Sequence, residues 1–211
     1  MSKNIKILFL FIWLLTITVQ SFPQSKINLP NIVLIFMDDM GYGDLDAYGS
    51  IHYTTPNLNK LAADGMRFTN FYAAQPVCTA SRAGIMTGCY PNRVGLVGAL
   101  FPKASIGLNS REETIPEVLK KKGYKTGMVG KWHLGDAEKF LPLQHGFDEY
   151  FGIPYSNDMW PVNYDGEPVT DTTTLRGKFP PLPLIEGNQP ERFIKNLEDM
   201  SAITTRYTQK A

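Results

Sequence analysis

The chain has 211 residues, enough for one domain or one and a half, and its composition is that of an ordinary globular protein. Its 21 Lys and Arg against 20 Asp and Glu leave a net charge of +1, which disfavours a nucleic-acid binder that relies on overall charge. With 18 Gly and 15 Pro the chain favours a loop-rich enzyme over a helical bundle, and its 2 Cys exclude a disulfide scaffold.

The first residues have the pattern of a secretory signal peptide. Lys3 and Lys6 precede an apolar run over residues 7–19, which is shorter than the roughly 20 residues of a membrane-spanning helix. Ser21 offers a small residue for cleavage, so we predict a signal peptide over residues 1–21. The mature chain, residues 22–211, would then be exported to a periplasmic, secreted or lysosome-like compartment. An uncleaved membrane anchor is the alternative.

The first predicted structural unit is a strand, a helix and a second strand. Apolar and β-branched residues over 31–37 predict a strand buried on both faces. Residues 55–62 predict a helix with a Thr55 cap, Pro at the first helical position and a stop at Gly65. Residues 67–72 are compatible with the strand that follows.

The second predicted unit begins at a capping box over residues 114–117, whose helix ends at Gly123 and leads into a strand over 124–130. Alternating strands and helices predict an α/β domain with a mainly parallel sheet. Residues 165–189 have a loop composition, and apolar residues at helical spacing predict one helix over 190–210.

Two adjacent carboxylates, Asp38 and Asp39, follow the first predicted strand. In open α/β sheets ligands bind at the carboxyl ends of the strands. Adjacent carboxylates repel each other, and a hard cation such as Ca²⁺ or Mg²⁺ relieves that repulsion by binding their oxygens. The alternative is a solvated turn, since Asp and Gly favour turns.

A second candidate group surrounds Cys78, which stands at a predicted helix start with Arg82 shortly after it. The helix dipole and the Arg82 cation would stabilise a thiolate, which suggests a nucleophile. A small buried hydrophobic side chain is the alternative. Cys89 could form a disulfide with Cys78 in an oxidising compartment, or remain a separate structural thiol.

A third candidate group, Lys131 and His133, lies just past the second predicted strand. Residues two apart share one face of an extended chain. A cation and an imidazole there suit an anionic substrate and proton transfer. The alternative is a surface Lys beside a hydrogen-bonded His.

Together these segments resemble the sulfatase family, in the order and spacing that the family uses. The matching residues are Asp38, Asp39, Gly41, Tyr42, Gly43 and Asp44, then Cys78 to Arg82 with Ala80 at the Pro/Ala position, then Gly130 to Gly135. Residues 152–158 and 181–184 are similar to the arylsulfatase A type in particular. The resemblance is strong over residues 31–160 and weak elsewhere. It implies an alkaline-phosphatase/sulfatase-like α/β fold, a mainly parallel sheet flanked by helices.

The resemblance also implies covalent catalysis. In this family a separate maturation enzyme oxidises the signature Cys, here Cys78, to formylglycine, so a disulfide to Cys89 would be self-defeating. The hydrated aldehyde, a geminal diol, attacks the sulfur of a sulfate ester, and the alcohol leaves. The second hydroxyl then loses its proton, sulfate is expelled and the aldehyde re-forms.

The implied roles of the remaining residues follow from their positions in the family motifs. Arg82 holds the diol, and Lys131 bridges diol and sulfate. His133 hydrogen-bonds the diol and takes the proton during elimination, and Ser156 is a supporting substrate contact.

The implied metal site consists of Asp38, Asp39 and the oxygen of modified Cys78, which would hold Ca²⁺, with Mg²⁺ as the alternative. Ca²⁺ takes 6–8 oxygen ligands. The family supplies the others, an Asp-Asn pair, together with a leaving-group His and a second sulfate-binding Lys, from downstream positions that this sequence does not match. We therefore expect residues 22–211 to be the amino-terminal part of a sulfatase catalytic domain, incomplete at its carboxyl end and inactive in isolation.

The expected activity is hydrolysis of a sulfate ester, with a sulfated sugar or glycolipid favoured as the natural substrate. Two alternatives stay open. One is a phosphonate or phosphate ester hydrolase on the same fold. The other is a fragment without turnover that folds only partly or binds a partner.

Overall fold

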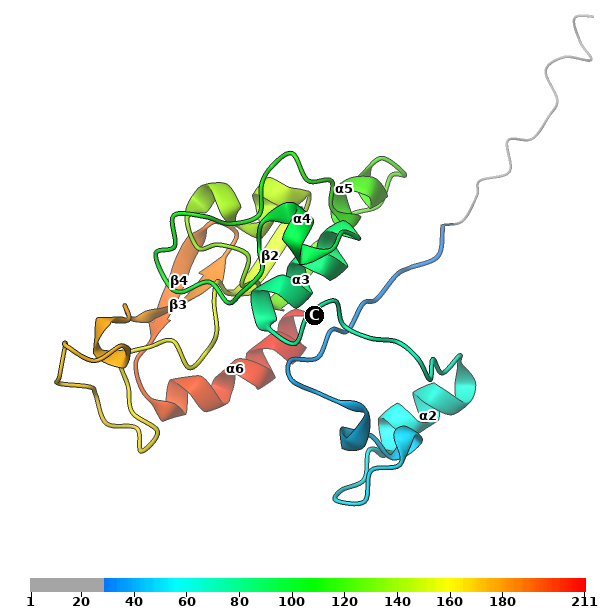
Figure 1. Ribbon diagram of the computed structural model, residues 1–211, viewed down its shortest axis with the longest axis horizontal. Coiled ribbons are helices and arrows are strands. Elements are labelled where there is room, and N and C mark those ends of the chain that lie inside the picture. Colours follow the sequence, from blue (N-terminus) through cyan, green and yellow to red (C-terminus); the bar gives the residue numbers. More distant parts are fainter. Residues whose placement is uncertain (1–28) are drawn as a thin grey trace, which may run out of the picture. The chain divides into compact units, whose positions relative to one another are not determined.

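The computed structural model describes residues 29–211, and the chain divides into two compact units, residues 1–41 and residues 42–211 (Figure 1). The predicted signal peptide over residues 1–21 lies outside the described residues and stays a prediction.

In the first unit, residues 31–37 do not form the buried strand that their composition predicts. The run has no regular secondary structure, and its apolar side chains are exposed, from 37% for Phe36 to 83% for Val33. A strand is defined by hydrogen bonds to a neighbouring strand, and the described residues 29–41 contain no strand that could supply them. The prediction of a strand from this pattern is therefore wrong for the unit as it stands.

The second unit begins with two 3₁₀ turns, η1 (Tyr42–Asp44) and η2 (Asp46–Tyr48), and the helix α2 (Pro56–Asp64). The helix has the predicted bounds, with Thr55 before it and Gly65 after it. Its amino-terminal end is held differently from the prediction, because the Thr55 side chain makes no capping bond.

Asp46 of η2 holds the start of α2 instead, through the residue before the helix and one side chain of its first turn. The Asp46 carboxylate accepts hydrogen bonds from the Thr55 backbone N–H at 3.0 Å and from the Asn59 amide at 2.8 Å. The strand considered for residues 67–72 is not formed, and these residues are exposed. Their backbone is tied locally, because the Phe71 N–H donates to the Tyr42 hydroxyl at 2.9 Å.

Three helices follow, namely α3 (Cys78–Thr87), α4 (Pro91–Val94) and α5 (Ile115–Lys120). The capping box predicted for α5 is confirmed: the Thr114 side chain accepts from the third helical N–H, and the Glu117 carboxylate accepts from the Thr114 N–H at 2.8 Å.

The sheet has four strands in the order β1 (Gly127–Lys131), β2 (Glu149–Ile153), β3 (Leu182–Glu186) and β4 (Gln189–Ile194). Strand β1 pairs with β2 in parallel, whereas the β2–β3 and β3–β4 pairs are antiparallel. The α/β class is confirmed. The sheet of the described residues is mixed and not mainly parallel, because β3 and β4 form a hairpin.

This hairpin corrects two expectations for the end of the chain. Residues 165–189, expected as loop, contain the 3₁₀ turn η5 (Arg176–Lys178) and strand β3. Residues 190–210, expected as one helix, contain most of β4 and then helix α6 (Leu197–Lys210). The helix starts at Asn196, whose side chain accepts from the Asp199 N–H at 2.8 Å, so the cap marks a boundary that apolar spacing alone did not reveal.

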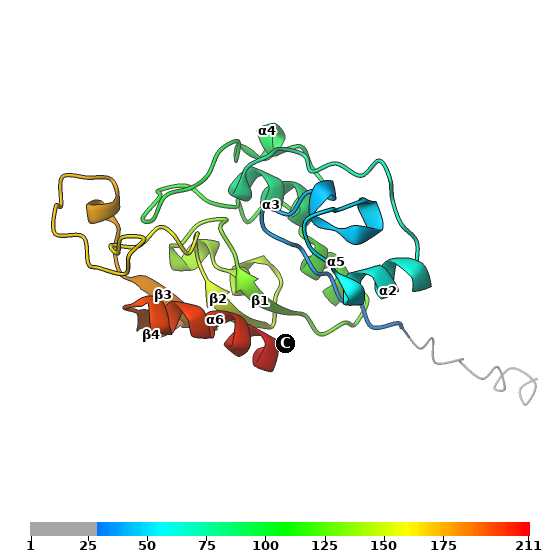
Figure 2. The ribbon, with the colours of Figure 1, turned by 90° about the horizontal axis from the view of Figure 1, so that it is seen from below.

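Helices cover both faces of the sheet. Figure 2 shows α6 along one face and α3 on the other. Alternation along each strand fills two cores: Phe151 of β2 packs in the cluster that includes Ile203 of α6, and its neighbour Tyr150 packs in the cluster that includes Ala83 of α3. Between β1 and β2 the chain runs through two 3₁₀ turns, η3 (Glu138–Phe140) and η4 (Pro142–His145).

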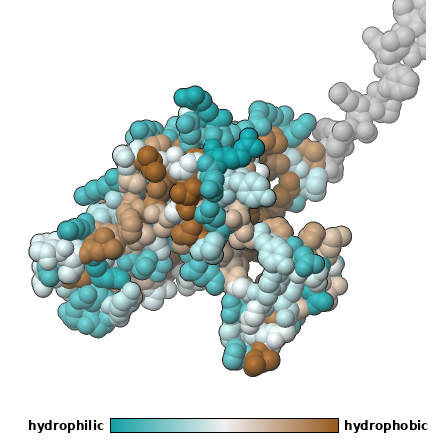
Figure 3. Space-filling view, in the orientation of Figure 1, coloured by the Kyte–Doolittle hydropathy of each residue, from teal (hydrophilic) through white to brown (hydrophobic). Residues whose placement is uncertain are grey.

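The surface of the second unit is mixed in polarity. On the face seen in Figure 3, hydrophobic residues lie dispersed among hydrophilic ones. Among residues 29–211, no helix combines the length and the apolar character that a membrane crossing requires.

Candidate active site

The candidate nucleophile, Cys78, is the first residue of α3, and Arg82 lies one helical turn further along. Side chains four apart share a helix face, so both point to the same side of α3. The positive end of the helix dipole lies at Cys78 and favours negative charge there. The thiol is partly buried, whereas Arg82 is 8% exposed.

The Lys-Trp-His segment predicted to carry a cation and an imidazole continues directly from β1. Lys131 is the last residue of that strand. The parallel ladder extends beyond it, because the N–H groups of Trp132 and His133 donate to the carbonyls of Ile153 and Pro154, each at 3.0 Å. Backbone hydrogen bonds therefore hold this segment, although it lies past the strand.

The Lys131 ammonium group joins three of the predicted site residues. Its Nζ donates to Cys78 Sγ at 3.2 Å and to Ser156 Oγ at 3.2 Å. Ser156 lies just after β2, the strand paired with β1. The structure thus brings together one residue from α3, one from the end of β1 and one from beyond the end of β2. A single cation there faces a nucleophilic atom and a hydroxyl.

Arg82 joins α3 to the same strand end. Its Nη1 donates to the Lys131 carbonyl oxygen at 2.6 Å, so this guanidinium fixes the backbone of the residue whose side chain reaches Cys78. A buried Arg bound to a carbonyl is a charge that does not move when the substrate arrives, which is the property expected of electrostatic preorganisation.

His133 is buried, with 1% of its surface exposed, and has a positive φ of 57°. Its Nε2 lies 2.8 Å from the Leu100 carbonyl oxygen. A carbonyl only accepts, so Nε2 carries the proton, and in the neutral ring Nδ1 is the basic nitrogen. The hydrogen bond thus fixes the tautomer and orients the ring.

Thr79 is a site residue that the sequence analysis missed. It is fully buried, and its hydroxyl donates to the His133 carbonyl at 2.7 Å while accepting from the Leu100 N–H at 3.1 Å. The Thr79 side chain therefore links α3 to both His133 and Leu100. These two residues are also joined to each other by the hydrogen bond from the His133 ring. No local sequence signal could have shown this, since the partners lie 54 and 21 positions away.

The remaining predicted site residues are Asp38 and Asp39, and Cys89 was expected to be a separate thiol. Asp38 and Asp39 lie in the first unit, and both are exposed. Asp39 has a positive φ of 55°, a conformation that Asp adopts more readily than most residues. Cys78 and Cys89 are both free thiols, so the structure has no disulfide between them.

Two buried phenols lie in or next to β2, namely Tyr150 and Tyr155. Burial raises the pKa of Tyr150 well above its usual value, with Tyr207 adding to the rise and Arg82 opposing it. Burial also raises the pKa of Tyr155, with a contribution from Asp136.

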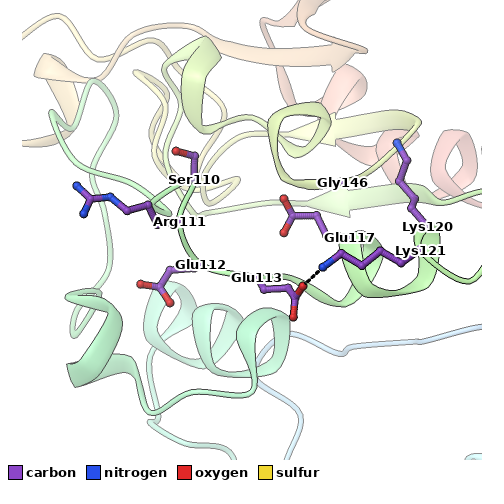
Figure 4. A pocket seen from close by; sticks show the side chains of 8 residues that line it. All are labelled: Ser110, Arg111, Glu112, Glu113, Glu117, Lys120, Lys121 and Gly146. Carbon is purple, nitrogen blue, oxygen red and sulfur yellow. Dashed lines mark hydrogen bonds and ion pairs between the residues drawn. The ribbon is translucent and has the colours of Figure 1, made fainter.

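A hollow of about 400 Å³ beside α5 contains none of the predicted site residues. Figure 4 shows its lining: Ser110, Arg111, Glu112, Glu113, Glu117, Lys120, Lys121 and Gly146. Its charges are largely matched within the hollow, where Lys121 pairs with Glu113. It contains none of the candidate catalytic residues and is not the candidate active site.

Comparison with known proteins agrees with this constellation. A family model described as Sulfatase matches residues 30–201. Arylsulfatase A of Bos taurus is 50% identical over 153 residues, which cover 71% of this chain and 30% of the relative. N-acetylgalactosamine-6-sulfatase of Homo sapiens is 49% identical over 133 residues, which cover 59% of this chain and 26% of the relative.

A solved structure agrees with the fold. The crystal structure of the PsFucS1 sulfatase from Pseudoalteromonas sp. superposes with a TM-score of 0.69 at 33% identity, covering 82% of this chain and 37% of that one. The chain spans less than a third of the length of the two curated relatives. The matched region contains Cys78, Arg82, Lys131, His133 and Ser156, and the chain belongs to the sulfatase family.

Proposed function

We propose that this chain supplies the nucleophile-bearing part of a sulfatase active site and that the whole protein hydrolyses sulfate esters. The observation that carries the proposal is the position of Lys131 Nζ, at 3.2 Å from both Cys78 Sγ and Ser156 Oγ. A sulfate group is an anion, and a partly buried ammonium beside the nucleophilic atom both binds it and neutralises the charge that develops during attack.

The nucleophile requires a modification of Cys78. Oxidation of its side chain to an aldehyde by a maturation enzyme, followed by hydration to a geminal diol, would place a hydroxyl where Sγ now lies. The maturation enzyme would act on a thiol, and Cys78 is a free, partly buried thiol whose sulfur accepts from Lys131. The diol supplies covalent catalysis with a route for sulfate release through loss of the second proton.

The chain's own residues divide the remaining work. Lys131 would bind the sulfate oxygens and the attacking oxygen together, and Ser156 would hold Lys131 in place through its hydroxyl and contact the substrate. Arg82 keeps the Lys131 backbone fixed. His133, with Nε2 bound to Leu100, would use Nδ1 to accept the proton that is lost when sulfate leaves.

Asp38 and Asp39 would contribute to a Ca²⁺ site, together with an oxygen on modified Cys78. Two adjacent exposed carboxylates provide the hard oxygen donors that Ca²⁺ or Mg²⁺ prefers. The ion would supply Lewis-acid polarisation of the sulfate oxygens.

Export completes the proposal. A signal peptide over residues 1–21 would send the protein to a periplasmic, secreted or lysosome-like compartment, and sulfated sugars or glycolipids are the substrate class that we favour there. Amino-terminal sequencing of exported protein should begin at or near Phe22. Intact Met1 in a membrane fraction would favour an uncleaved anchor.

The test uses the whole protein that contains this chain, co-expressed with a formylglycine-generating enzyme. The tryptic peptide with Cys78 should change mass by the loss of H₂S and the gain of one oxygen. A panel of matched aryl sulfate and phosphate esters should show turnover of the sulfates. Cys78→Ala should abolish turnover, because no side chain remains to form the diol, whereas the matched control Cys89→Ala should keep it.

The outcomes separate the candidate reactions. A preference for phosphate or phosphonate esters would show that the protein is a phosphate or phosphonate ester hydrolase instead of a sulfatase. Turnover in Cys78→Ala would end the covalent mechanism.

A further inference from the structure

His145 is a fully buried imidazole to which the proposed chemistry assigns no role. It is the last residue of η4 and is 0% exposed. Neither ring nitrogen has a hydrogen-bond partner among the described residues. Because its polar atoms make no such bond, the ring can stabilise its surroundings only by packing, through its shape and its flat face.

That face lies against Trp132. The two rings stack with centroids 5.8 Å apart and planes 29° from parallel. Trp132 is itself buried at 1% exposure, its Nε1–H donates to the Phe140 carbonyl at 2.7 Å, and Phe147 meets its ring edge-on at 6.3 Å. The indole is thus held by a polar contact at one point and by aromatic contacts elsewhere.

Trp132 occupies the position between the two candidate catalytic residues. The backbone leaves the strand after Lys131, and at His133 it is left-handed, with a φ of 57°. Lys131 reaches Cys78 and the His133 ring reaches Leu100, whereas Trp132 packs into the aromatic cluster with His145 and Phe147. The buried indole is therefore an anchor placed directly between these two side chains.

The position of His145 is fixed from its other side by α5. The His145 carbonyl accepts from the Thr114 hydroxyl at 2.7 Å. The next residue, Gly146, has a φ of 93°, and a Cβ there would lie 2.6 Å from the Glu117 backbone nitrogen. The capping-box residues Thr114 and Glu117 therefore pack directly against the turn that carries the imidazole. Glu117 is the charged group that acts on this ring.

We propose that His145 is a positioning residue: by stacking on Trp132 it holds Lys131 in contact with Cys78 and His133 in contact with Leu100. The path runs from the α5 capping box through the imidazole and the indole to the active site. The inference rests on the proposed function for its meaning. Its test uses no sulfate ester, so the failure of one can be told from the failure of the other.

The measurement is the rate at which a neutral alkylating reagent, iodoacetamide, modifies unmatured Cys78 in a Cys89→Ala background. Lys131 Nζ lies 3.2 Å from Cys78 Sγ, so a change in this contact changes the surroundings of the sulfur that the reagent attacks. Lys131→Met sets the scale of the loss when this contact is absent. We expect His145→Ala to slow alkylation by roughly three- to tenfold, approaching Lys131→Met. We expect His145→Phe, which keeps a flat ring, to stay within about twofold of the parent.

A stability-matched control separates positioning from general loosening. Leu184 is also fully buried but belongs to the core on the opposite face of the sheet. Leu184→Ala should lower the thermal midpoint as His145→Ala does, yet leave Cys78 alkylation close to the parent rate.

Three results would each overturn the proposal. They are parent-like alkylation in His145→Ala, loss in His145→Phe equal to that in His145→Ala, and equal slowing in Leu184→Ala. The second would show that the ring nitrogens, and not the stacked face, do the work.

Discussion

Replacing Thr79 with Val tests whether a hydroxyl with no chemistry of its own holds the active-site segment. The substitution preserves shape but removes the group that donates to the His133 carbonyl and accepts from the Leu100 N–H. Thr79 is completely buried, so water cannot easily replace the lost hydroxyl. Both backbone groups would lose this partner at once.

The expected cost follows from those two groups. A buried donor or acceptor left unsatisfied costs about 1–3 kcal/mol, so with partial relaxation Thr79→Val should lose about 2–4 kcal/mol of unfolding free energy. Thr79→Ser keeps the hydroxyl and loses one buried methyl, which predicts a smaller loss of about 1 kcal/mol. Urea unfolding followed by far-UV circular dichroism measures both.

The control for this Thr-to-Val substitution is the same change at Thr87, a second threonine on the same helix. The Thr87 hydroxyl donates to the Ala83 carbonyl at 2.7 Å and accepts from the Cys89 N–H at 3.2 Å, but Thr87 is only partly buried, so water can replace the lost hydroxyl. Thr87→Val should therefore cost less than about 1 kcal/mol. Equal stability of Thr79→Val and Thr79→Ser would refute the reasoning, because it would show that the two backbone groups do not depend on the hydroxyl.

Three further predictions concern titration and packing. Lys120 and the Thr126 backbone hold the pKa of Asp148 at about 2, so its stabilising effect is present above pH 3.8 and is lost as the pH falls toward about 2; in an NMR titration Lys120→Met should raise this pKa. Burial lowers the pKa of His145 below 6.5, with Glu117 opposing, so the folded state resists a proton that the unfolded chain accepts. The thermal midpoint should therefore fall as the pH drops below about 6.5, and this part of the fall should vanish in His145→Phe. A Cβ at Gly152 would overlap a carbonyl oxygen of the paired strand, so Gly152→Ala should abolish soluble expression, and a normal yield would contradict the observed β1–β2 spacing.

Helix ends were the part of the fold most readable from the sequence. The capping box at Thr114 and Glu117 depends on residues within a few positions of one another. Local hydrogen bonds between near neighbours are encoded in short patterns, so a sequence pattern can locate them.

Strands were less predictable, because a strand exists only through a partner. The run over residues 31–37 has the composition of a buried strand but no strand among residues 29–41 to pair with. Residues 189–194 show the converse. Their apolar spacing is compatible with a helix, yet the turn at Gly187, with a φ of 64°, returns the chain onto β3 and makes them a strand.

The site could be predicted only in part for the same reason. The resemblance to the sulfatases selected Cys78, Lys131 and Ser156, and the structure brings these three together. Thr79 and His145 were not recognised as contributors, because each acts through contacts to residues distant in sequence and neither carries a motif. Motif spacing in the sequence therefore identifies the residues that carry out the chemistry more readily than the residues that hold those side chains in position.

Those holding contacts explain why α3 can meet the sheet in only one register. Two α3 side chains, three positions apart, bind two carbonyls of the β1 extension: Thr79 binds that of His133, and Arg82 binds that of Lys131. The same segment is also fixed on the side of β2, because the N–H groups of Trp132 and His133 donate to the carbonyls of Ile153 and Pro154. A slip of α3 by one residue would move its side chains by about 1.5 Å along the axis and about 100° around it, and would break both helix contacts. The place of Cys78 beside Lys131 is therefore determined by backbone carbonyls, which substitutions of the catalytic side chains leave intact.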